Sequence, residues 1–400
     1  MTDKTETGRG KKSHVTFSRR HMLAAGSAGL AAAMGGASFR AASAEPGPDT
    51  GNDIHTKTDT VSVAPDGNYD RVPLRKDSVR VTAVQSFMRA VRDTSNPAPE
   101  MQANVDHMLE LLDMANGFWG AQDLVCFHEQ PIMGWNPWTL KEALRVAIDI
   151  PGPETERLGA KAREHGCYIS FGTYARDPDW PGHLLLNGIL IAPDGEVAAN
   201  HWKTNNSRGG IPGWDIFTTS IYDVLDQYRE MYGEDEVLQI ARTDIGNISC
   251  AITPFQPDIA RALAMKGLEI RLSSASGGYS TAEAQLISRH NRLWSVICNQ
   301  SISPEQPGFP EFSGSGDTAI YAPDRTPPKR VKSAHEEFVT ATIPVASFRR
   351  SRTIPAGVPI EMLMPVYQAY TPRNGPNAQA TYVPADSAEA SRHFTEKRNW

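Results

Sequence analysis

From residue 79 onward, the spacing of apolar positions alternates between a pattern typical of strands and a pattern typical of helices. Short apolar runs predict strands at 79–85, 123–127 and 167–174, and a helical spacing of apolar residues predicts helices at 101–116 and 154–165. Strands that alternate with helices are typical of an α/β protein.

The second half continues the same alternation. Two strand-like segments, 184–191 and 196–202, flank Pro193-Asp194-Gly195, which is a turn sequence, so they predict a hairpin. Further helices are expected at 222–232, 257–266 and 281–291, and further strands at 237–242, 246–250, 269–273, 293–299, 318–322 and 337–343. This order of elements fits two sheets with helices outside them.

The N-terminus has the pattern of an export signal. Arg19 and Arg20 directly precede an apolar stretch at 23–33, and Ala42-Ser43-Ala44 follows as a small-residue cleavage site. The stretch is interrupted by glycine and is shorter than the roughly 20 apolar residues that span a bilayer. We therefore expect residues 1–44 to be a twin-arginine signal, with export to the periplasm or the extracellular space; a disordered basic tail is the alternative.

Three further parts follow the signal. Residues 45–76 are rich in Pro, Gly, Asp and Thr, which indicates a flexible leader. Residues 77–350 are long enough for one large domain with a substantial core. Residues 351–400 form a Pro-rich, aromatic-containing C-terminal extension, which we expect either to contact a second copy in an oligomer or to pack on its own chain.

Charge and cysteine content exclude several classes of protein. The chain has 40 Lys and Arg and 46 Asp and Glu; residues 1–44 hold seven of the former and two of the latter, so the remainder has a net charge of −11. Nucleic acids and anionic membranes are therefore unfavourable partners. Four cysteines lack C-x-x-C spacing, and the sequence has no paired-His motif, P-loop or G-x-G-x-x-G, so we expect no metal site and no cofactor.

Two charged residues lie where such a fold presents reactive groups. Glu129 follows the predicted strand 123–127, and Lys203 ends the hairpin. The carboxyl ends of buried strands are the usual place for functional side chains in α/β sheets. Taken singly, a loop carboxylate and a solvated strand-end lysine are the alternatives.

The order of many short features resembles the carbon–nitrogen hydrolase (nitrilase/amidase) superfamily. From residue 79 to about 343 the chain carries Phe127-x-Glu129, Gly152-Pro153-Glu154, Gly172, Asn187, Pro193-Asp194-Gly195, Lys203, Gly246, Pro257-Asp258, Met265-Lys266-Gly267, Arg289-x-Asn291 and Asn299. The resemblance implies a four-layer α-β-β-α sandwich, an oligomer, and hydrolysis of small amides, nitriles or carbamoyl compounds without a cofactor. It also implies a Glu-Lys-Cys site, with Glu129 and Lys203 at the first two positions.

The third position departs from the family pattern. A thiolate attacks, a carboxylate moves the proton and an ammonium stabilises the oxyanion in such a site. Counting four residues from Gly246 leads to Cys250, whereas counting six back from Pro257 leads to Ala251, and Ile252 stands where the family has an acid. Cys250 remains the candidate nucleophile, and Ser249 and Thr253 are weaker alternatives.

Aromatic and amide side chains near these positions are candidates for substrate binding. They are Trp135, Trp202, Asn205 and Trp214. Core packing or surface exposure is the alternative for each of them.

Two functions follow from these features. The first is a hydrolase that cleaves a non-peptide C–N bond of a small molecule through Glu129, Lys203, Cys250 and a covalent acyl-enzyme. The second is a catalytically impaired protein of the same fold that binds a small ligand or acts as an oligomeric scaffold, because the segment around Cys250 is atypical.

The export signal gives a first prediction. Replacing Arg19→Lys and Arg20→Lys together keeps the charge but removes the arginine pair, and should keep the protein in the cytoplasm, as cell fractionation would show. The matched change Lys11→Arg with Lys12→Arg should leave export intact. Equal export of both variants would contradict the twin-arginine interpretation.

Overall fold

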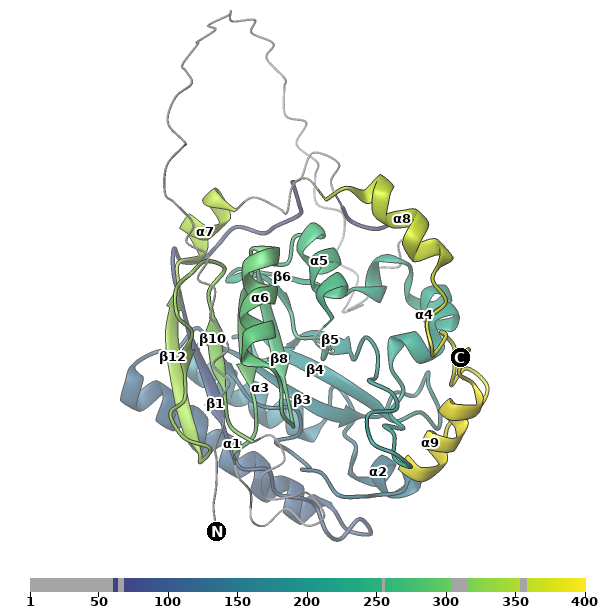
Figure 1. Ribbon diagram of the computed structural model, residues 1–400. Helices are drawn as coiled ribbons and strands as arrows, with labels where there is room; N and C mark the ends of the chain where they lie inside the picture. Colours follow the sequence, from purple (N-terminus) through teal and green to yellow (C-terminus); the bar gives the residue numbers. More distant parts are fainter. Residues whose placement is uncertain (1–59, 64–67, 254–255, 302, 304–314, 353–357) are drawn as a thin grey trace, which may run out of the picture. The chain divides into compact units, whose positions relative to one another are not determined.

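The structure is a computed structural model that describes residues 60–63, 68–253, 256–301, 303, 315–352 and 358–400 (Figure 1). The export signal predicted at 1–44 lies outside the described residues. So does most of the leader, but its last part is described: the Tyr69 hydroxyl donates a hydrogen bond to Glu269 (2.7 Å).

One six-stranded sheet contains the first strands of the chain. Its order is β12 (Glu337–Ile343), β1 (Val79–Gln85), β2 (Leu124–Cys126), β3 (Tyr168–Ala175), β4 (Leu185–Ile191), β5 (Val197–Trp202). Strands β1, β2 and β3 are parallel, whereas β3, β4 and β5 run antiparallel and include the predicted hairpin. The carboxyl ends of β2 and β5 place Glu129 and Lys203.

A second six-stranded sheet contains the later strands. Its order is β11 (Lys329–Arg330), β10 (Ala319–Tyr321), β9 (Trp294–Cys298), β8 (Ile270–Ser274), β7 (Gly246–Ser249), β6 (Ala241–Thr243). Strands β7, β8 and β9 are parallel. Cys250 follows β7 directly.

The two sheets pack face to face. Buried residues of both, among them Val81, Leu190, Ile248, Leu272 and Val296, form one apolar cluster. Burying a Val, Leu or Ile side chain contributes about 1.5–3 kcal/mol, so this layer is a main source of stability.

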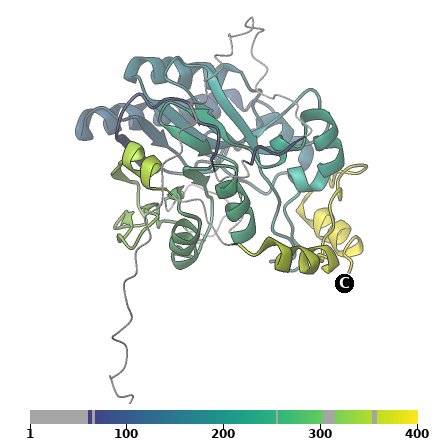
Figure 2. The same ribbon diagram turned by 90° about the horizontal axis from the view of Figure 1, so that it is seen from above.

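Helices cover the outer faces of the sheets. Helices α1 (Ala98–Trp119), α2 (Leu140–Val146) and α3 (Pro153–His165) share a core cluster with the first sheet. Helices α5 (Pro257–Met265) and α6 (Thr281–Asn291) lie against the second sheet, on the opposite side of the sheet pair in the turned view (Figure 2). This arrangement confirms the expected α-β-β-α sandwich.

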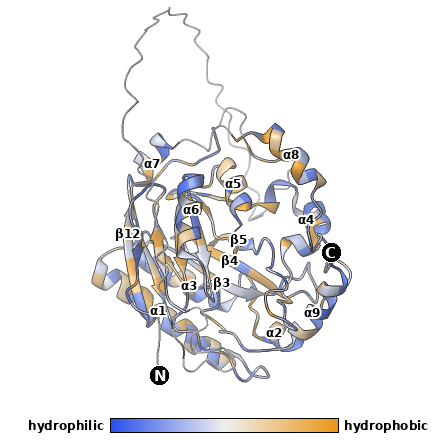
Figure 3. Cartoon of the chain, viewed as in Figure 1, coloured by the Kyte–Doolittle hydropathy of each residue, from blue (hydrophilic) through white to orange (hydrophobic). Residues whose placement is uncertain are grey.

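Shorter elements surround the site and the C-terminus. They are η1 (Ile221–Val224), α4 (Leu225–Tyr232), η2 (Asp235–Val237), α7 (Val345–Ser351), α8 (Ile360–Ala369) and α9 (Ser387–Glu396). Helix α8 has no buried residue, although it includes hydrophobic residues (Figure 3). Among the described residues, no helix is long and apolar enough to cross a membrane.

Several elements differ from the sequence expectation. Strand β11 and helices α7, α8 and α9 were not predicted, and two further differences have local causes. The strand predicted at 237–242 is mostly irregular, with the η2 turn and only Ala241–Thr243 as strand β6. Helix α2 was not predicted because its seven residues are too few for a helical apolar period. It begins at a capping box in which the Thr139 side chain accepts from the backbone N–H of Glu142, and the Glu142 carboxylate accepts from that of Thr139.

Two glycines opposite each other in the first sheet allow the backbone of other segments to approach. Gly172 on β3 pairs with Gly188 on β4, so both would direct a Cβ to the same face. A Cβ at Gly172 would lie 2.6 Å from the Glu129 carbonyl oxygen, and one at Gly188 would lie 1.7 Å from the Cys250 carbonyl oxygen. The segments that carry Glu129 and Cys250 therefore lie against the same two glycines.

This contact predicts a large cost for a methyl group at residue 188. Gly188→Ala should lower the free energy of unfolding by roughly 3 kcal/mol or more, since the obstacle is backbone and cannot rotate away. Urea unfolding would measure it. Gly117→Ala, on the exposed part of α1 with nothing within 4 Å of the added methyl, should be neutral or stabilise by up to about 1 kcal/mol. Similar stability of both variants would contradict the role given to Gly188.

Candidate functional site

Glu129 and Lys203 form an ion pair at the carboxyl ends of two strands of the first sheet. The distance from Lys203 Nζ to Glu129 Oε1 is 3.8 Å, and the side chains are 9% and 10% exposed, respectively. Backbone hydrogen bonds fix Lys203 on both sides: its N–H donates to Leu186 O (2.9 Å) and its carbonyl accepts from Ile221 (3.0 Å). The structure thus brings together the first two residues of the predicted site.

Burial determines the charge state around this pair. Desolvation lowers the pKa of the Lys203 ammonium, and the neighbouring Glu129 carboxylate opposes that shift. Burial also lowers the pKa of His128 to about 4, so this neighbour of Glu129 is neutral at pH 7 and adds no positive charge. Burial and the charge of Glu129 raise the pKa of the Tyr174 phenol, which stays protonated.

Cys250, the candidate nucleophile, follows β7. Its thiol contacts Gly188 on the first sheet and not the Glu129–Lys203 pair. Its Sγ donates to Gly188 O (3.1 Å), and its backbone N–H donates to His201 Nδ1 (3.2 Å). The side chain is part of the apolar cluster between the sheets. Within the described residues, its sulfur makes no hydrogen bond to Glu129 or Lys203, and burial raises its pKa to about 12.

The residues after Cys250 run beside Lys203. The N–H of Thr204 donates to Ile252 O (3.2 Å), and the Thr253 hydroxyl donates to Ala251 O (3.2 Å). Thr253, one of the weaker alternatives from the sequence, thus turns toward its own backbone. Ser249, the other, is buried on β7.

A serine that the sequence did not single out contacts Glu129. The Ser276 hydroxyl, in the loop after β8, donates to Glu129 Oε2. The sequence predicts where this loop lies, because it follows the predicted strand 269–273, whose carboxyl end should lie beside the carboxyl ends of the neighbouring strands. The sequence does not predict that the Ser276 side chain points toward Glu129.

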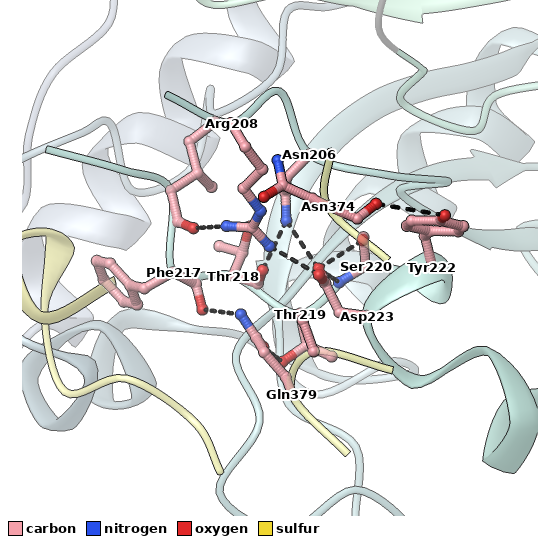
Figure 4. A network of polar contacts seen from close by, with 12 residues as sticks. Asn206, Arg208, Phe217, Thr218, Thr219, Ser220, Tyr222, Asp223, Asn374 and Gln379 are labelled. Atoms are coloured by element: carbon pink, nitrogen blue, oxygen red, sulfur yellow. Dashed lines mark hydrogen bonds and ion pairs between the residues drawn. The ribbon is translucent and has the colours of Figure 1, made fainter. Parts of the chain in front are cut away.

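A buried polar network follows Lys203 (Figure 4). Arg208 and Asp223 form an ion pair of 2.8 Å with side chains 6% and 5% exposed. Asp223 also accepts from Asn206 (3.2 Å) and from the Ser220 hydroxyl (2.6 Å), and Arg208 donates to Ile216 O. This network holds the 204–223 segment, and the charges of Arg208 and Asp223 act on Lys203 with opposite sign.

The C-terminal extension packs on this segment. Gln379 donates to Phe217 O (3.3 Å) and accepts from the Thr219 hydroxyl (2.5 Å), while the Arg208 guanidinium lies 3.4 Å from the centre of the Phe394 ring. Extension and segment, together with residues of α4, η2 and α5, line an open cavity of about 560 Å³. Residues 371–396 of the extension are therefore in contact with their own chain.

The predicted substrate-binding residues are in different surroundings. Trp135 and Trp214 lie together, half-buried, with ring centres 6.4 Å apart, and Asn205 lines the cavity. Trp202 instead packs in a satellite core, 5.1 Å from the Trp180 ring and 5.3 Å from the Tyr228 ring.

The position of Cys250 gives a prediction of its reactivity. With a pKa of about 12, on the order of one thiol in 100,000 is ionised at pH 7, so native Cys250 should resist iodoacetamide. Peptide mass mapping would measure the modification. Ser347→Cys, at an exposed site on α7, should react quickly, and all four native cysteines should react in guanidinium. Rapid labelling of native Cys250 would show that the thiol is activated after all.

Comparisons with known proteins support the assignment of the fold. An amidase from Nesterenkonia sp. AN1, solved as a mutant in complex with acrylamide, matches with a TM-score of 0.50, 14% identity and coverage of 74% of this chain and 100% of its own. The C. elegans NitFhit protein matches with a TM-score of 0.53 and 14% identity, over 73% of this chain and 65% of its own. At this identity the likeness concerns the fold alone.

Sequence relatives and a family model extend the comparison. Formamidases of Bacillus thuringiensis (strain Al Hakam) and Bacillus cereus (strain AH820) are 27% identical over 131 residues, which is 31% of this chain. The match spans only 38% of the length of these relatives. The family model described as "Carbon-nitrogen hydrolase" matches residues 80–353, more than half of the chain. The chain therefore belongs to the carbon–nitrogen hydrolase family.

Proposed function

We propose that this protein hydrolyses the C–N bond of a small amide at the Glu129–Lys203 pair. The observation that carries the proposal is the buried contact of 3.8 Å between the two side chains, which follow the carboxyl ends of β2 and β5. Amide hydrolysis needs a base that takes a proton from the nucleophile and returns one to the leaving nitrogen, and a positive charge for the carbonyl oxygen. Glu129 supplies the first and Lys203 the second.

The relatives suggest which amides to test first. The curated relatives are named formamidases, and the Nesterenkonia amidase was solved with acrylamide. Formamide, acrylamide and other short amides are therefore the first substrates to test, with nitriles and carbamoyl compounds beside them. The cavity next to Asn205 and Arg208 is the proposed place for the rest of the substrate.

The route through Cys250 is a finer form of this proposal. In it, Cys250 forms an acyl-enzyme, as the family resemblance implies. The sulfur would have to turn away from Gly188 O and lose a proton whose pKa is about 12. Both requirements act against a fast thiol nucleophile.

A non-catalytic function is the second candidate. The position of the Cys250 thiol, which bonds to Gly188 O and has a raised pKa, favours it. If Cys250 serves only as core packing and no other group attacks, the buried ion pair and the cavity would bind an amide-like ligand without cleaving it. Ligand binding without ammonia release would then be measured by calorimetry.

Two further proposals concern place and assembly. We propose export by the twin-arginine route and a homo-oligomer that uses helix α8. On that helix Met362, Val366 and Tyr367 are 75%, 67% and 51% exposed. Exposed apolar side chains on one helix are typical of contact surfaces.

Charge-removing variants test the hydrolase proposal. Glu129→Gln and Lys203→Met should each lower ammonia release from the best amide by about 100- to 10,000-fold, because each removes a group needed in the transition state. A coupled ammonia assay would measure this. Since leaving one buried charge unpaired costs about 3–5 kcal/mol, the double variant Glu129→Gln with Lys203→Met should fold better than either single one and remain inactive.

A partly exposed ion pair provides the matched control. Lys161 and Glu164 on α3 lie 2.9 Å apart, and their side chains are 15% and 59% exposed, respectively. Lys161→Met and Glu164→Gln should keep full activity. The proposal is overturned if the wild-type protein releases no ammonia from any compound, or if the Glu129 and Lys203 variants are as active as these controls.

A further inference from the structure

The last residue of β8 and the loop after it lie directly along the segment that carries Glu129. The Ser274 hydroxyl donates to Phe127 O (3.1 Å), the Glu129 N–H donates to Ala275 O (3.3 Å), and the Ser276 hydroxyl donates to Glu129 Oε2. Three successive contacts therefore fix the register of one segment against the other. The contact of Ser276 with the carboxylate follows from this register.

Glu129 holds two different groups through its two carboxylate oxygens. Oε1 lies 3.8 Å from the Lys203 ammonium, and Oε2 accepts from the Ser276 hydroxyl. A hydroxyl, a carboxylate and an ammonium thus lie in one cluster. These are the three groups that a covalent amide hydrolysis needs, with oxygen in the place of sulfur.

Ser276 is also more accessible than Cys250. Its residue is half-buried, whereas Cys250 is 2% exposed and faces the layer between the sheets. The neighbouring Gly277 is half-buried as well, and nothing lies within 4 Å of the place where its own Cβ would be. Of the two residues, Ser276 is therefore the one that solvent reaches more readily.

We propose that Ser276 is the nucleophile of this site. The inference rests on the proposed function and deepens it by naming the attacking atom. The Ser276 proton passes to Glu129 Oε2 while the Oγ electron pair bonds to the carbonyl carbon, and the π electrons move to the carbonyl oxygen beside Lys203.

Collapse of the adduct completes the first half of the reaction. The C–N bond breaks, and the nitrogen leaves with that electron pair and with the proton from Glu129, as ammonia or an amine. An ester remains on Ser276. Water then gives a proton to Glu129 and attacks the ester carbon. The bond between that carbon and Oγ breaks, Oγ takes the proton back from Glu129, and the carboxylic acid is released.

Acylation with an activated ester tests the assignment. Wild-type protein mixed with p-nitrophenyl acetate and quenched in acid should carry one acetyl group, which peptide mapping should place on Ser276. Because the product is an oxyester, it should resist neutral hydroxylamine, which cleaves thioesters. Ser276→Cys should still become acetylated, and its product should be hydroxylamine-sensitive.

Activity measurements complete the test. Ser276→Ala should lose the acetyl group and should release ammonia at least about 100-fold more slowly, with an unchanged circular dichroism spectrum. Ser347→Ala, which removes an exposed hydroxyl from α7, should behave as wild type in both assays. Full ammonia release by Ser276→Ala, or an acetyl group on Cys250 in the wild type, would overturn the inference.

The outcomes separate this inference from the proposed function. Amide hydrolysis that survives Ser276→Ala refutes the inference and leaves the hydrolase intact. Acetylation of Ser276 without any amide hydrolysis supports the nucleophile and refutes the amidase. Absence of both acetylation and hydrolysis in the wild type refutes both.

Discussion

The close approach of two backbones to a pair of glycines is the constraint on which the site depends. Gly172 and Gly188 face each other across β3 and β4, and Glu129 and Cys250 lie over them. Any side chain at these positions would push the segments away. Because both glycines lie on interior strands of the first sheet, the segments that carry Glu129 and Cys250 are held against regular secondary structure.

The same contact explains why the Glu129–Lys203 ion pair and the Cys250 thiol are separated. It turns the Cys250 side chain toward Gly188 O and into the apolar layer, while Lys203 and Glu129 remain at the strand ends. A buried ammonium is stable only beside a counter-charge, and Glu129 is that partner. The pair Arg208–Asp223 and the C-terminal extension pack on the segment that follows Lys203.

Much of the fold was predictable from the sequence because its strands are short apolar runs between clear turn signals. The hairpin around Pro193-Asp194-Gly195 and the strands that present Glu129 and Lys203 are examples. Helix α2 was not, since its seven residues depend on the Thr139 cap. The role of Ser276 depends on a contact between segments 147 residues apart, which no local pattern encodes. The thiol direction of Cys250 likewise depends on Gly188, 62 residues away.

The pairing of the first strand with the last one has a consequence for biosynthesis. Strand β1 lies between β2 and β12, and Val79 is in register with Ile343. During translation the edge of β1 that faces β12 therefore stays without its partner strand until residues 337–343 have left the ribosome. Completion of the first sheet is therefore a late step of folding, after the other described strands have been synthesised.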